Sequence, residues 1–441
     1  MELARSRLLV AAALFSVGFL VLAIRLVDLG LFERVVETPA KRDGSSAIAA
    51  ARADIVDRNG VLLATSLRTA SLYADPKLVL DPEDAADKLT KVLPDLNRTR
   101  VLARLRSPTR FEWIKRDLTP EEEWRVNSLG IPGLAFEEED RRIYPQGRLA
   151  AHVLGFVDVD GNGLAGIERF FDRRLGGAGI AGAPLALSLD IRVQHILREE
   201  ILRAMETFSA IGAAGLVMDV NSGEILGLAS LPDFDPNRPG GAPPEALFNR
   251  AVQGVYELGS GFKAFTVAIA LETGVASLDT VYDATKPIRV GRFLIRDHHP
   301  KARPLNVPEV FVYSSNIGAA KMALDIGGDV QRQFLERLGL LRAPKLELLE
   351  TGEPIVPHPW REVTTMTVSY GHGLAVTPLQ LTAGIAALVN GGRLIPATLL
   401  RKDDDVRRNM SGERIISPET SLAMRQLLRL AVTQGTGSNA D

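Results

Sequence analysis

The chain reads YELGSGFK at residues 256–263 and continues into the apolar run AFTVAIALETG at residues 264–274. Gly259 permits a sharp entry into a helix. The pattern predicts a helix with Ser260 in its first turn and Lys263 one turn later on the same face. A lysine amine desolvated in an apolar wall has a lowered pKa and can take the serine's proton, while the helix start favours the developing negative charge. The stretch therefore predicts an activated serine nucleophile.

The Ser-x-x-Lys spacing alone is a weak signal, because chance produces it in many chains, and its ordinary alternative is a helix start with a surface lysine. A second pattern, Tyr313-Ser314-Ser315-Asn316, follows at a break between two helical runs. Ser314 could pass a proton between Lys263 and a leaving amine, and Asn316 could hold the lysine or a substrate amide. Ordinary helix capping by Ser314 or Ser315 explains the same residues equally well.

The composition is that of a folded protein with several domains. At a prior of roughly 150 residues per domain, the 441 residues suggest two or three domains, and 46% of them are hydrophobic. The formal net charge of -2 argues against the broad positive field that nucleic-acid binding needs. There is no cysteine, which excludes a thiol nucleophile, thiolate metal sites and disulfides. Catalysis must use hydroxyl, amine, carboxylate or imidazole groups.

One segment near the start of the chain is apolar enough to enter a membrane. Residues 8–24 read LLVAAALFSVGFLVLAI without a charge, and arginines flank the run on both sides. At about 1.5 Å per residue this run nearly spans the ~30 Å hydrocarbon layer. It is longer than the core of a signal peptide, about 7–15 residues, and no small-x-small cleavage site follows directly. We therefore expect an uncleaved anchor at residues 8–31, whose orientation the flanking arginines do not fix.

A glycine-rich stretch, GGAGIAGA at residues 176–183, is typical of a linker, and we place a domain boundary there. The region before it is expected to contain a two-residue hairpin turn at Asn59-Gly60, helices at residues 81–93 and 119–129, and a strand at residues 111–114.

The region after the linker reads as a helix, two paired strands and then mostly helices, which is an α+β pattern. We expect Asp190 to cap a helix with Ile191, Ile196, Ile201 and Met205 roughly on one side, strands at residues 214–220 and 224–230, and a later helix opened by Thr377-Pro378 and closed by Asn390-Gly391-Gly392.

Residues 161–166, GNGLAG, imitate two ligand motifs. They match the dinucleotide fingerprint, but Asp158 and Asp160 just before them would repel a pyrophosphate. The same segment has calcium-loop spacing, but Arg169 stands where the bidentate glutamate is required. A structural turn is the better interpretation. The six histidines show no zinc-binding spacing.

Penicillin-binding proteins and class A β-lactamases share Ser-x-x-Lys, a later Ser-x-Asn-type element and Lys-Thr-Gly. The first two occur here in that order, and the chain resembles the class B penicillin-binding proteins, most closely the division-specific septal type. The resemblance rests on the N-terminal anchor, the two motifs above and, in order, RADIVDRNG at 52–60, RIYP at 142–145, AAHVLG at 150–155, GIE at 166–168, SLD at 188–190 and TPLQ at 377–380.

The resemblance implies an α+β chain with a cytoplasmic tail at residues 1–7, an anchor at 8–31, a mixed α/β pedestal at 32–180 and a transpeptidase domain of antiparallel sheet and helices at 185–441. The large part of the chain would lie in the periplasm, carried by the inner membrane. The implied activity is D,D-transpeptidation of peptidoglycan stem peptides ending in D-Ala-D-Ala, with β-lactams as inhibitors. No metal and no organic cofactor are implied.

The implied catalytic residues are Ser260 as nucleophile and Lys263 as general base, with Ser314 and Asn316 completing a proton relay. The implied partners are an FtsW-type polytopic glycosyltransferase and other divisome proteins, besides the membrane. Gly261 stands where the family usually has threonine, and Leu258 where proline is common.

The main departure from the family is that no Lys-Thr-Gly occurs in the chain. In the family that strand recognises the substrate carboxylate and supplies part of the oxyanion hole, and losing one such donor costs about 10²–10³ in rate. We expect a transpeptidase domain that is incomplete at its C-terminus, so that the 441 residues are a fragment of a longer reading frame.

Three other functions remain open at this point. The first is a catalytically inactive, membrane-anchored divisome scaffold, which the absence of Lys-Thr-Gly favours and the presence of Ser260 and Lys263 disfavours. The second is a β-lactam hydrolase or sensor, which the anchor and the pedestal disfavour. The third is a class B penicillin-binding protein of the elongation type.

Overall fold

The computed structural model describes residues 52–176, 183–291, 293–403, 405, 407 and 412–440, which belong to one structural unit. The predicted anchor at residues 8–31 lies outside them, as does most of the glycine-rich linker. Within the described residues, none of the helices combines the length and the apolar character needed to cross a bilayer.

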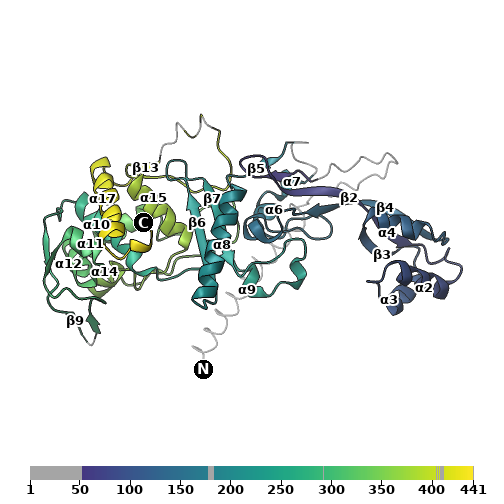
Figure 1. Cartoon of the computed structure of the whole chain (residues 1–441), viewed down its shortest axis with the longest axis horizontal. Coiled ribbons are helices and arrows are strands. Elements are labelled where there is room, and N and C mark those ends of the chain that lie inside the picture. The colour runs from purple at the N-terminus through teal and green to yellow at the C-terminus, as the bar shows by residue number, and fades with distance from the viewer. Residues whose placement is uncertain are drawn as a thin grey trace, which may run out of the picture. The chain divides into compact units, whose positions relative to one another are not determined.

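The N-terminal region is organised by one long strand, β2 (Leu62–Ala74), which carries most of a five-stranded sheet (Figure 1). It pairs antiparallel with β1 (Ile55–Val56), β3 (Glu112–Leu118) and β4 (Leu134–Ile143). Strand β1 also pairs parallel with β5 (Leu185–Ala186), so the chain beyond the linker returns to this sheet.

The helices of this region have the following bounds: α2 Pro82–Val92, α3 Arg98–Leu105, α4 Pro120–Asn127, η1 Gly147–Ala150, α5 Ala151–Leu154, α6 Gly166–Phe170 and α7 Asp172–Leu175. The two predicted helices are confirmed. Asp81 caps α2 through hydrogen bonds from two backbone amides, and Thr119 forms a capping box with Glu122 at α4. The predicted strand at 111–114 overlaps the start of β3, which begins at Glu112 and continues to Leu118.

The turn at Asn59-Gly60 is real, but the prediction of a two-residue hairpin loop is wrong. Val56 pairs with Leu62, so residues 57–61 form the connection. The carboxylate of Asp57 accepts hydrogen bonds from the backbone amides of Asn59 (2.7 Å) and Val61 (2.8 Å). The side-chain acceptor satisfies the amides of this wider loop, so the strands do not need to close at Asn59-Gly60.

The segment 158–162 is the structural turn that was expected. The Asp158 carboxylate accepts hydrogen bonds from the backbone amides of Asp160 and Asn162, each at 2.9 Å. The Asn162 side chain donates to the same carboxylate.

The region after the linker begins with α8 (Ile191–Thr207), which packs on the antiparallel pair β6 (Ala213–Met218) and β7 (Ile225–Leu231). Asp190 caps α8 as predicted, but the predicted buried face is partly wrong, because Ile196 is 61% exposed. The face that meets the strands runs through Val193, Leu197 and Ile201, which lie over Gly215 and Gly227. Glycines in both strands admit these side chains.

The remaining elements are mostly helices, with the following bounds: η2 Pro239–Gly241, α9 Pro244–Leu247, η3 Gly259–Phe262, α10 Lys263–Glu272, β8 Val281–Asp283, β9 Ile288–Val290, β10 Phe293–Ile295, β11 Pro304–Asn306, α11 Val307–Val312, α12 Asn316–Ile326, α13 Gly328–Arg337, α14 Glu362–Val368, α15 Pro378–Val389, β12 Arg393–Leu394, β13 Glu413–Arg414, α17 Pro418–Gln434 and η4 Ser438–Ala440. The helix from Thr377-Pro378 to Asn390 is confirmed as α15 with its two caps.

Helix α10 is the centre of the largest hydrophobic core. It contacts α11, α12, α13, α15 and α17, and its first eight residues are all buried. Figure 1 shows α10 and α11 among these helices, beside the C-terminal helix α17. A helix that is apolar on every side can only be stable when neighbours cover it on every side, as they do here.

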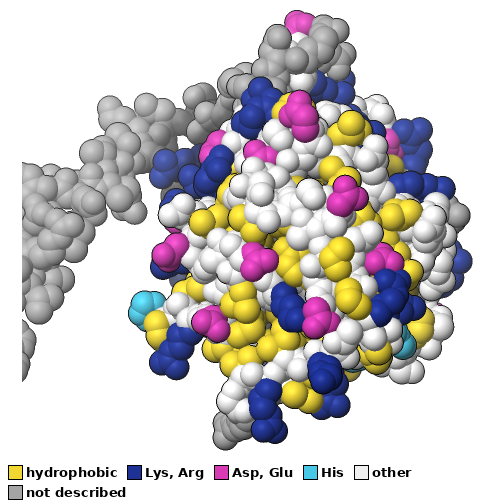
Figure 2. Space-filling model, turned by 90° about the vertical axis from the view of Figure 1, so that its left-hand side faces the viewer, with side chains coloured by type: hydrophobic (Ala, Val, Ile, Leu, Met, Phe, Trp, Pro, Cys, Tyr) yellow, Lys and Arg dark blue, Asp and Glu magenta, His cyan; other side chains and the backbone are white. Residues whose placement is uncertain are grey.

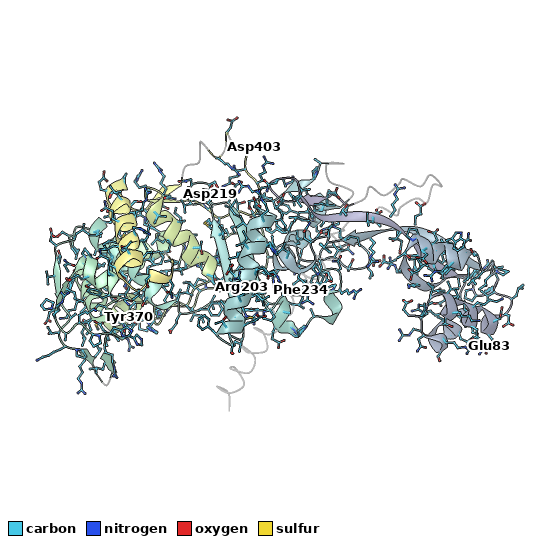
Figure 3. The ribbon with its side chains drawn as sticks, in the orientation of Figure 1. Glu83, Arg203, Asp219, Phe234, Tyr370 and Asp403 are labelled. Carbon is cyan, nitrogen blue, oxygen red and sulfur yellow. The ribbon has the colours of Figure 1, made fainter. Side chains whose placement is uncertain are left out.

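The two regions are joined by contacts between distant residues. Asn59 donates to the Asp190 carboxylate at 3.1 Å, and Arg58 lies 3.6 Å from the buried carboxylate of Glu224. Phe234, labelled in Figure 3, packs with Ala151 and Ala246 in a small apolar cluster. The mixed helix and strand content of both regions agrees with the predicted α+β class.

Candidate active site

Ser260 lies on a short 3-10 turn, η3, directly before α10, and its side chain is exposed. Gly259 has φ +58°, which a glycine adopts without strain, and its amide donates to the Gly371 carbonyl at 3.3 Å. The sequence predicts Ser260 in the first turn of the α-helix. In the structure Ser260 lies in η3, just before the α-helix, because α10 starts only at Lys263.

Lys263 is 1% exposed, yet its amine reaches the exposed nucleophile. Its Nζ atom donates to Ser260 Oγ at 2.8 Å, to Ser314 Oγ at 2.9 Å and to the Ser314 carbonyl at 3.0 Å. Burial lowers the pKa of Lys263 to about 8, against a weaker opposing effect of the Asp297 carboxylate. The surface-lysine alternative is therefore wrong.

Ser314 lies between α11 and α12 with φ +56°, a conformation that costs a residue with a side chain about 1–2 kcal/mol. Its hydroxyl lies 3.1 Å from Ser260 Oγ, so Ser260, Lys263 and Ser314 form a closed triangle of hydrogen bonds. Strained backbone held in place by its surroundings is a common feature of functional sites.

The capping explanation holds for the neighbouring residue only. Ser315 caps α12 by accepting from the Gly318 amide at 3.0 Å, whereas the Ser314 hydroxyl faces Lys263. Asn316 is the first residue of α12, and its amide donates to the Arg296 carbonyl at 3.0 Å. The structure shows no hydrogen bond from Asn316 to Lys263, so its part in the relay stays a prediction.

Asp297 is a residue that the sequence reasoning missed. It is 8% exposed, and its carboxylate accepts from Ser315 Oγ at 2.8 Å and from the Ile317 amide at 3.0 Å. It thereby ties the loop before β11 to the start of α12, directly beside Ser314. The only sequence signal was an acidic residue in the polar run RDHHP, which does not reveal a partner near residue 315.

The segment that leads to Ser260 is clamped to residues 371–376. Tyr256 and Val376 exchange two backbone hydrogen bonds, at 2.9 and 3.0 Å. The Glu257 carboxylate accepts from the Gly373 amide at 2.7 Å and lies 3.1 Å from His372 Nδ1. Two regions more than a hundred residues apart in sequence thus fix the position of the nucleophile.

The arrangement suits acyl transfer through a serine ester. An exposed hydroxyl, a buried amine and a second hydroxyl lie within hydrogen-bonding distance of one another, which is the geometry of an activated nucleophile with a proton relay. In the part of the chain that the structure describes, no cluster of three or more acidic or histidine side chains could hold a metal. On the face drawn in Figure 2, basic side chains are interspersed with acidic ones.

Comparisons with known proteins agree with this geometry. The family model described as penicillin binding protein transpeptidase domain matches residues 213–441, and the model described as penicillin-binding protein dimerisation domain matches residues 47–180.

Three curated proteins show the extent of the similarity. The chain is 43% identical to the probable peptidoglycan D,D-transpeptidase FtsI of Caulobacter vibrioides strain NA1000, over 88% of this chain and 66% of that protein. It is 33% identical to the probable peptidoglycan D,D-transpeptidase PenA of Neisseria meningitidis serogroup A, over 96% of this chain and 79% of that protein. It is 32% identical to the peptidoglycan D,D-transpeptidase FtsI of Escherichia coli K12, over 85% of this chain and 67% of that protein.

Proposed function

Because the chain belongs to the class B penicillin-binding proteins of the FtsI-like group, we propose that it cross-links peptidoglycan stem peptides during septal cell-wall synthesis through an acyl-enzyme on Ser260. The chain spans 66% of the length of its Caulobacter relative, so the activity is proposed for the protein as a whole.

The observation that carries the proposal is the triangle of Ser260, Lys263 and Ser314. Neutral Lys263 takes the proton of the Ser260 hydroxyl as Oγ attacks the carbonyl carbon of the penultimate D-Ala. The C–N bond breaks, the terminal D-Ala leaves, and its nitrogen receives the proton through the Ser314 hydroxyl. The amine of a second stem peptide then attacks the ester and gives up a proton to the same relay, which frees Ser260.

The relay works because the two groups differ in their environment. Ser260 is open to substrate, whereas burial keeps part of the Lys263 population neutral near physiological pH. Asn316 lies at the start of α12, two residues before Gly318, whose amide Ser315 caps. We propose that its free carbonyl oxygen binds a substrate amide, while its amide group stays on Arg296.

The domain boundaries and the location belong to the same proposal. We propose a tail at residues 1–7, an anchor at 8–31 in the inner membrane, a pedestal at 32–180 and a periplasmic transpeptidase domain at 185–441. The uncharged run at residues 8–24 supports the anchor. An FtsW-type glycosyltransferase and other divisome proteins are the proposed partners of the anchor and the pedestal.

A fluorescent penicillin tests the chemistry, because β-lactams acylate the nucleophile of such enzymes. We expect the full chain to form a stable adduct that mass spectrometry of its peptides locates on Ser260. The Ser260→Ala variant should give no adduct, and Ser277→Ala, at another exposed serine outside the site, is a matched control that should label normally. Labelling that survives Ser260→Ala, or that never forms, contradicts the proposal.

The same experiment separates the alternatives. Absence of Ser260-dependent labelling favours the inactive scaffold. Rapid release of hydrolysed penicillin with many turnovers favours a β-lactam hydrolase, whereas a long-lived adduct favours the transpeptidase. Localisation of a fluorescent fusion at midcell supports the septal role, and localisation along the sidewall supports the elongation type.

A further inference from the structure

A strongly basic segment forms the hairpin of β9 and β10 and the loop that follows it. Residues 286–303 contain six lysines and arginines but only one carboxylate, that of Asp297, whereas the whole chain has 52 basic and 54 acidic residues. Ile295 packs in one apolar cluster with Ala320 of α12 and Met366 of α14. Figure 1 shows β9 below α12 and α14. The basic segment is therefore held against the helices that carry the catalytic site.

The chain after β10 alternates between the core and the solvent. Ile295 and Asp297 are buried, whereas Arg296 and His298 are exposed. Asp297 is turned toward α12, because its carboxylate accepts a hydrogen bond from Ser315 Oγ at 2.8 Å. Side chains that alternate in this way lie on opposite sides of the chain. The side chains of Arg296 and His298 are therefore presented to solvent.

Two contacts connect cations of this segment to the residues around Ser314. The Asn316 side chain donates to the Arg296 carbonyl at 3.0 Å. The Nζ atom of Lys301 lies 4.4 Å from the centroid of the Tyr313 ring, a distance at which a cation and an aromatic face attract each other. Tyr313 and Asn316 stand on the two sides of Ser314, whose hydroxyl lies 3.1 Å from the nucleophile. Arg296 and Lys301 are therefore anchored beside the catalytic triangle.

The protein does not neutralise these two cations. Arg296 and Lys301 are exposed, and among the described residues no carboxylate lies within 4.0 Å of their side-chain nitrogen atoms. Asp297 is turned inward, and the next carboxylate along the chain, that of Glu309, is paired with Arg303 at 2.6 Å. A guanidinium and an ammonium group held beside an active site without a counter-charge attract an anionic substrate.

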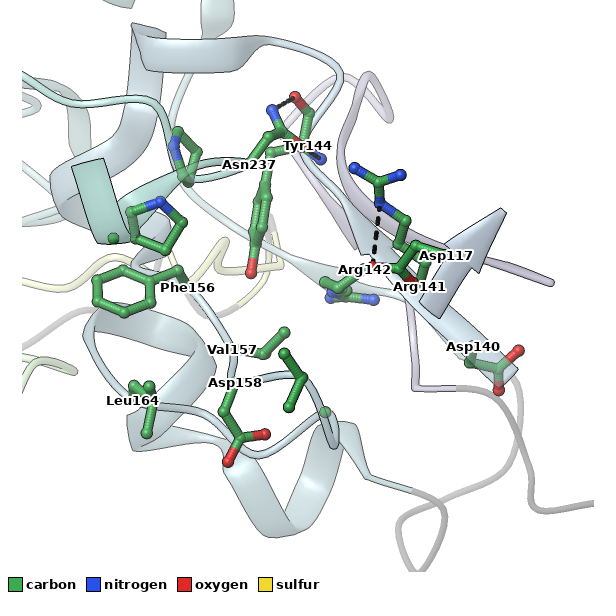
Figure 4. A pocket seen from close by; sticks show the side chains of 15 residues that line it. Asp117, Asp140, Arg141, Arg142, Tyr144, Phe156, Val157, Asp158, Leu164 and Asn237 are labelled. Atoms are coloured by element: carbon green, nitrogen blue, oxygen red, sulfur yellow. Dashed lines mark hydrogen bonds and ion pairs between the residues drawn. The ribbon is translucent and has the colours of Figure 1, made fainter. Parts of the chain in front are cut away.

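Arginines at a cavity elsewhere in the chain do have counter-charges. Figure 4 shows this cavity, of about 500 Å³, which Arg141 and Arg142 help to line. Arg142 donates to the buried Glu168 carboxylate at 2.7 Å, and Arg141 lies 4.0 Å from Asp117. These pairings leave little positive charge for a ligand at that cavity. The unneutralised cations beside Ser314 are the better candidates for binding an acidic group.

The substrate of the proposed reaction is itself acidic. Besides its C-terminal carboxylate, a stem peptide carries the α-carboxylate of a γ-linked D-Glu, and a further carboxylate where its third residue is diaminopimelate. We call these the internal carboxylates. They belong to the two residues that precede the penultimate D-Ala. The proposed function places a substrate amide on the carbonyl oxygen of Asn316, whose amide group rests on Arg296. A stem peptide bound there has its acidic residues next to the basic segment.

We propose that Arg296 and Lys301 bind the internal carboxylates of a stem peptide and so select acidic stem peptides over amidated ones. This inference rests on the proposed function, because it specifies which substrate the Ser260 site prefers. The two cations take no part in proton transfer. They act on binding, so their loss raises KM for the acidic peptide with little change in kcat.

Ligand-observed NMR with two pentapeptides tests this inference on the full chain carrying Ser260→Ala, which binds without turnover. One is L-Ala-γ-D-Glu-meso-diaminopimelate-D-Ala-D-Ala, and the other is the same peptide amidated at both internal carboxylates. Both keep the C-terminal carboxylate, so only the internal charges differ. We expect the acidic peptide to bind about 3- to 10-fold more tightly at low salt. The preference should fall below about 2-fold in about 0.5 M salt, because salt screens exposed charges.

Substitutions in the same Ser260→Ala background identify the cations. Arg296→Gln and Lys301→Gln should each reduce the preference for the acidic peptide about 2- to 5-fold and leave binding of the amidated peptide unchanged. Lys301→Arg keeps the charge and should keep the preference. Lys77→Gln, a matched control at an exposed lysine of the N-terminal region, should bind both peptides as the parent chain does.

The inference is overturned if the acidic peptide does not bind, if the two peptides bind equally well, or if both glutamine variants keep the full preference. Equally tight binding of tri-L-glutamate also overturns it, because that result would show a general attraction for anions. Acylation of the wild-type chain by fluorescent penicillin separates this failure from failure of the proposed function, since acylation requires Ser260 but no stem peptide. A chain that is acylated but shows no preference contradicts this inference alone.

Discussion

The Nζ atom of Lys263 lies 2.8 Å from the Oγ atom of Ser260. The amine belongs to a side chain that is 1% exposed, while the hydroxyl is open to solvent. This difference arises because the chain turns at Gly259, so that Ser260 stays at the surface and Lys263 enters the core with the first turn of α10. A buried amine and an exposed hydroxyl are therefore joined by one hydrogen bond.

The rate of Ser260 acylation should rise with pH and level off above about pH 8. Burial lowers the pKa of Lys263 to about 8, and only the neutral amine can accept the serine proton. Stopped-flow measurement of fluorescent penicillin acylation from pH 6 to 10 checks this. A rate that is flat from pH 6 to 8 would contradict Lys263 as the general base.

Lys263→Met should stabilise the protein while it abolishes acylation. The folded-state pKa lies below the unfolded value of 10.5, so at pH 7 the fold carries the cost of a buried ammonium, and this cost disappears as pH rises from about 8 to 10.5. We expect a gain of about 1 kcal/mol or more in the free energy of unfolding at pH 7 and a loss of at least about 10² in acylation rate. Urea unfolding at pH 7 and pH 10 checks it, because the gain should shrink at the higher pH.

Ser314→Gly and Ser314→Ala should distinguish the effect of backbone strain on stability from the effect of the hydroxyl on the acylation rate. Both remove the hydroxyl, so both should slow acylation about 10²–10⁴-fold. Only glycine relieves the positive φ of +56°, so Ser314→Gly should be more stable than Ser314→Ala by about 1 kcal/mol. Equal melting temperatures for the two variants would show that the backbone there is not strained.

Asp297→Asn should shift the pH profile of acylation to lower pH. The Asp297 carboxylate raises the pKa of Lys263, so its loss lowers that pKa further. The loss of a charged acceptor for Ser315 and Ile317 should also cost about 1–3 kcal/mol of stability. A purely structural role would lower stability without moving the profile, which distinguishes the two.

Gly371→Ala should disrupt the nucleophile, whereas Gly373→Ala should not. Both glycines have φ +84°, so both substitutions carry the same backbone strain. A Cβ atom at position 371 would lie 2.0 Å from the Gly259 carbonyl oxygen, next to Ser260, but at position 373 the nearest atom is a threonine hydroxyl at 3.4 Å. We expect a loss of at least about 10² in acylation rate for Gly371→Ala alone, beyond the strain of about 1–2 kcal/mol that the two share. Comparable rates for both variants would show that the clash does not reach Ser260.

Local features were predictable from the sequence because neighbouring residues specify them. Asp81, Thr119, Asp190 and Thr377 begin helices as predicted, since each caps amides only two or three residues away. The Ser-x-x-Lys motif is also local, because one helical turn brings its two groups together. The loop at residues 57–61 was mispredicted since its width depends on the Asp57 carboxylate and on strand register, which Asn59-Gly60 does not reveal.

By itself the sequence determined which groups could do chemistry: a chain without cysteine, a serine and lysine one turn apart, and the motifs of a family. Only the tertiary structure decided that Lys263 is buried, that Ser314 and not Ser315 faces it, and that Asp297 supports the loop. The physical reason is that burial and hydrogen-bond pairing depend on what distant segments pack against. The type of a residue determines which hydrogen bonds it can donate or accept. Its neighbours in space determine whether those groups are buried and which partners they find.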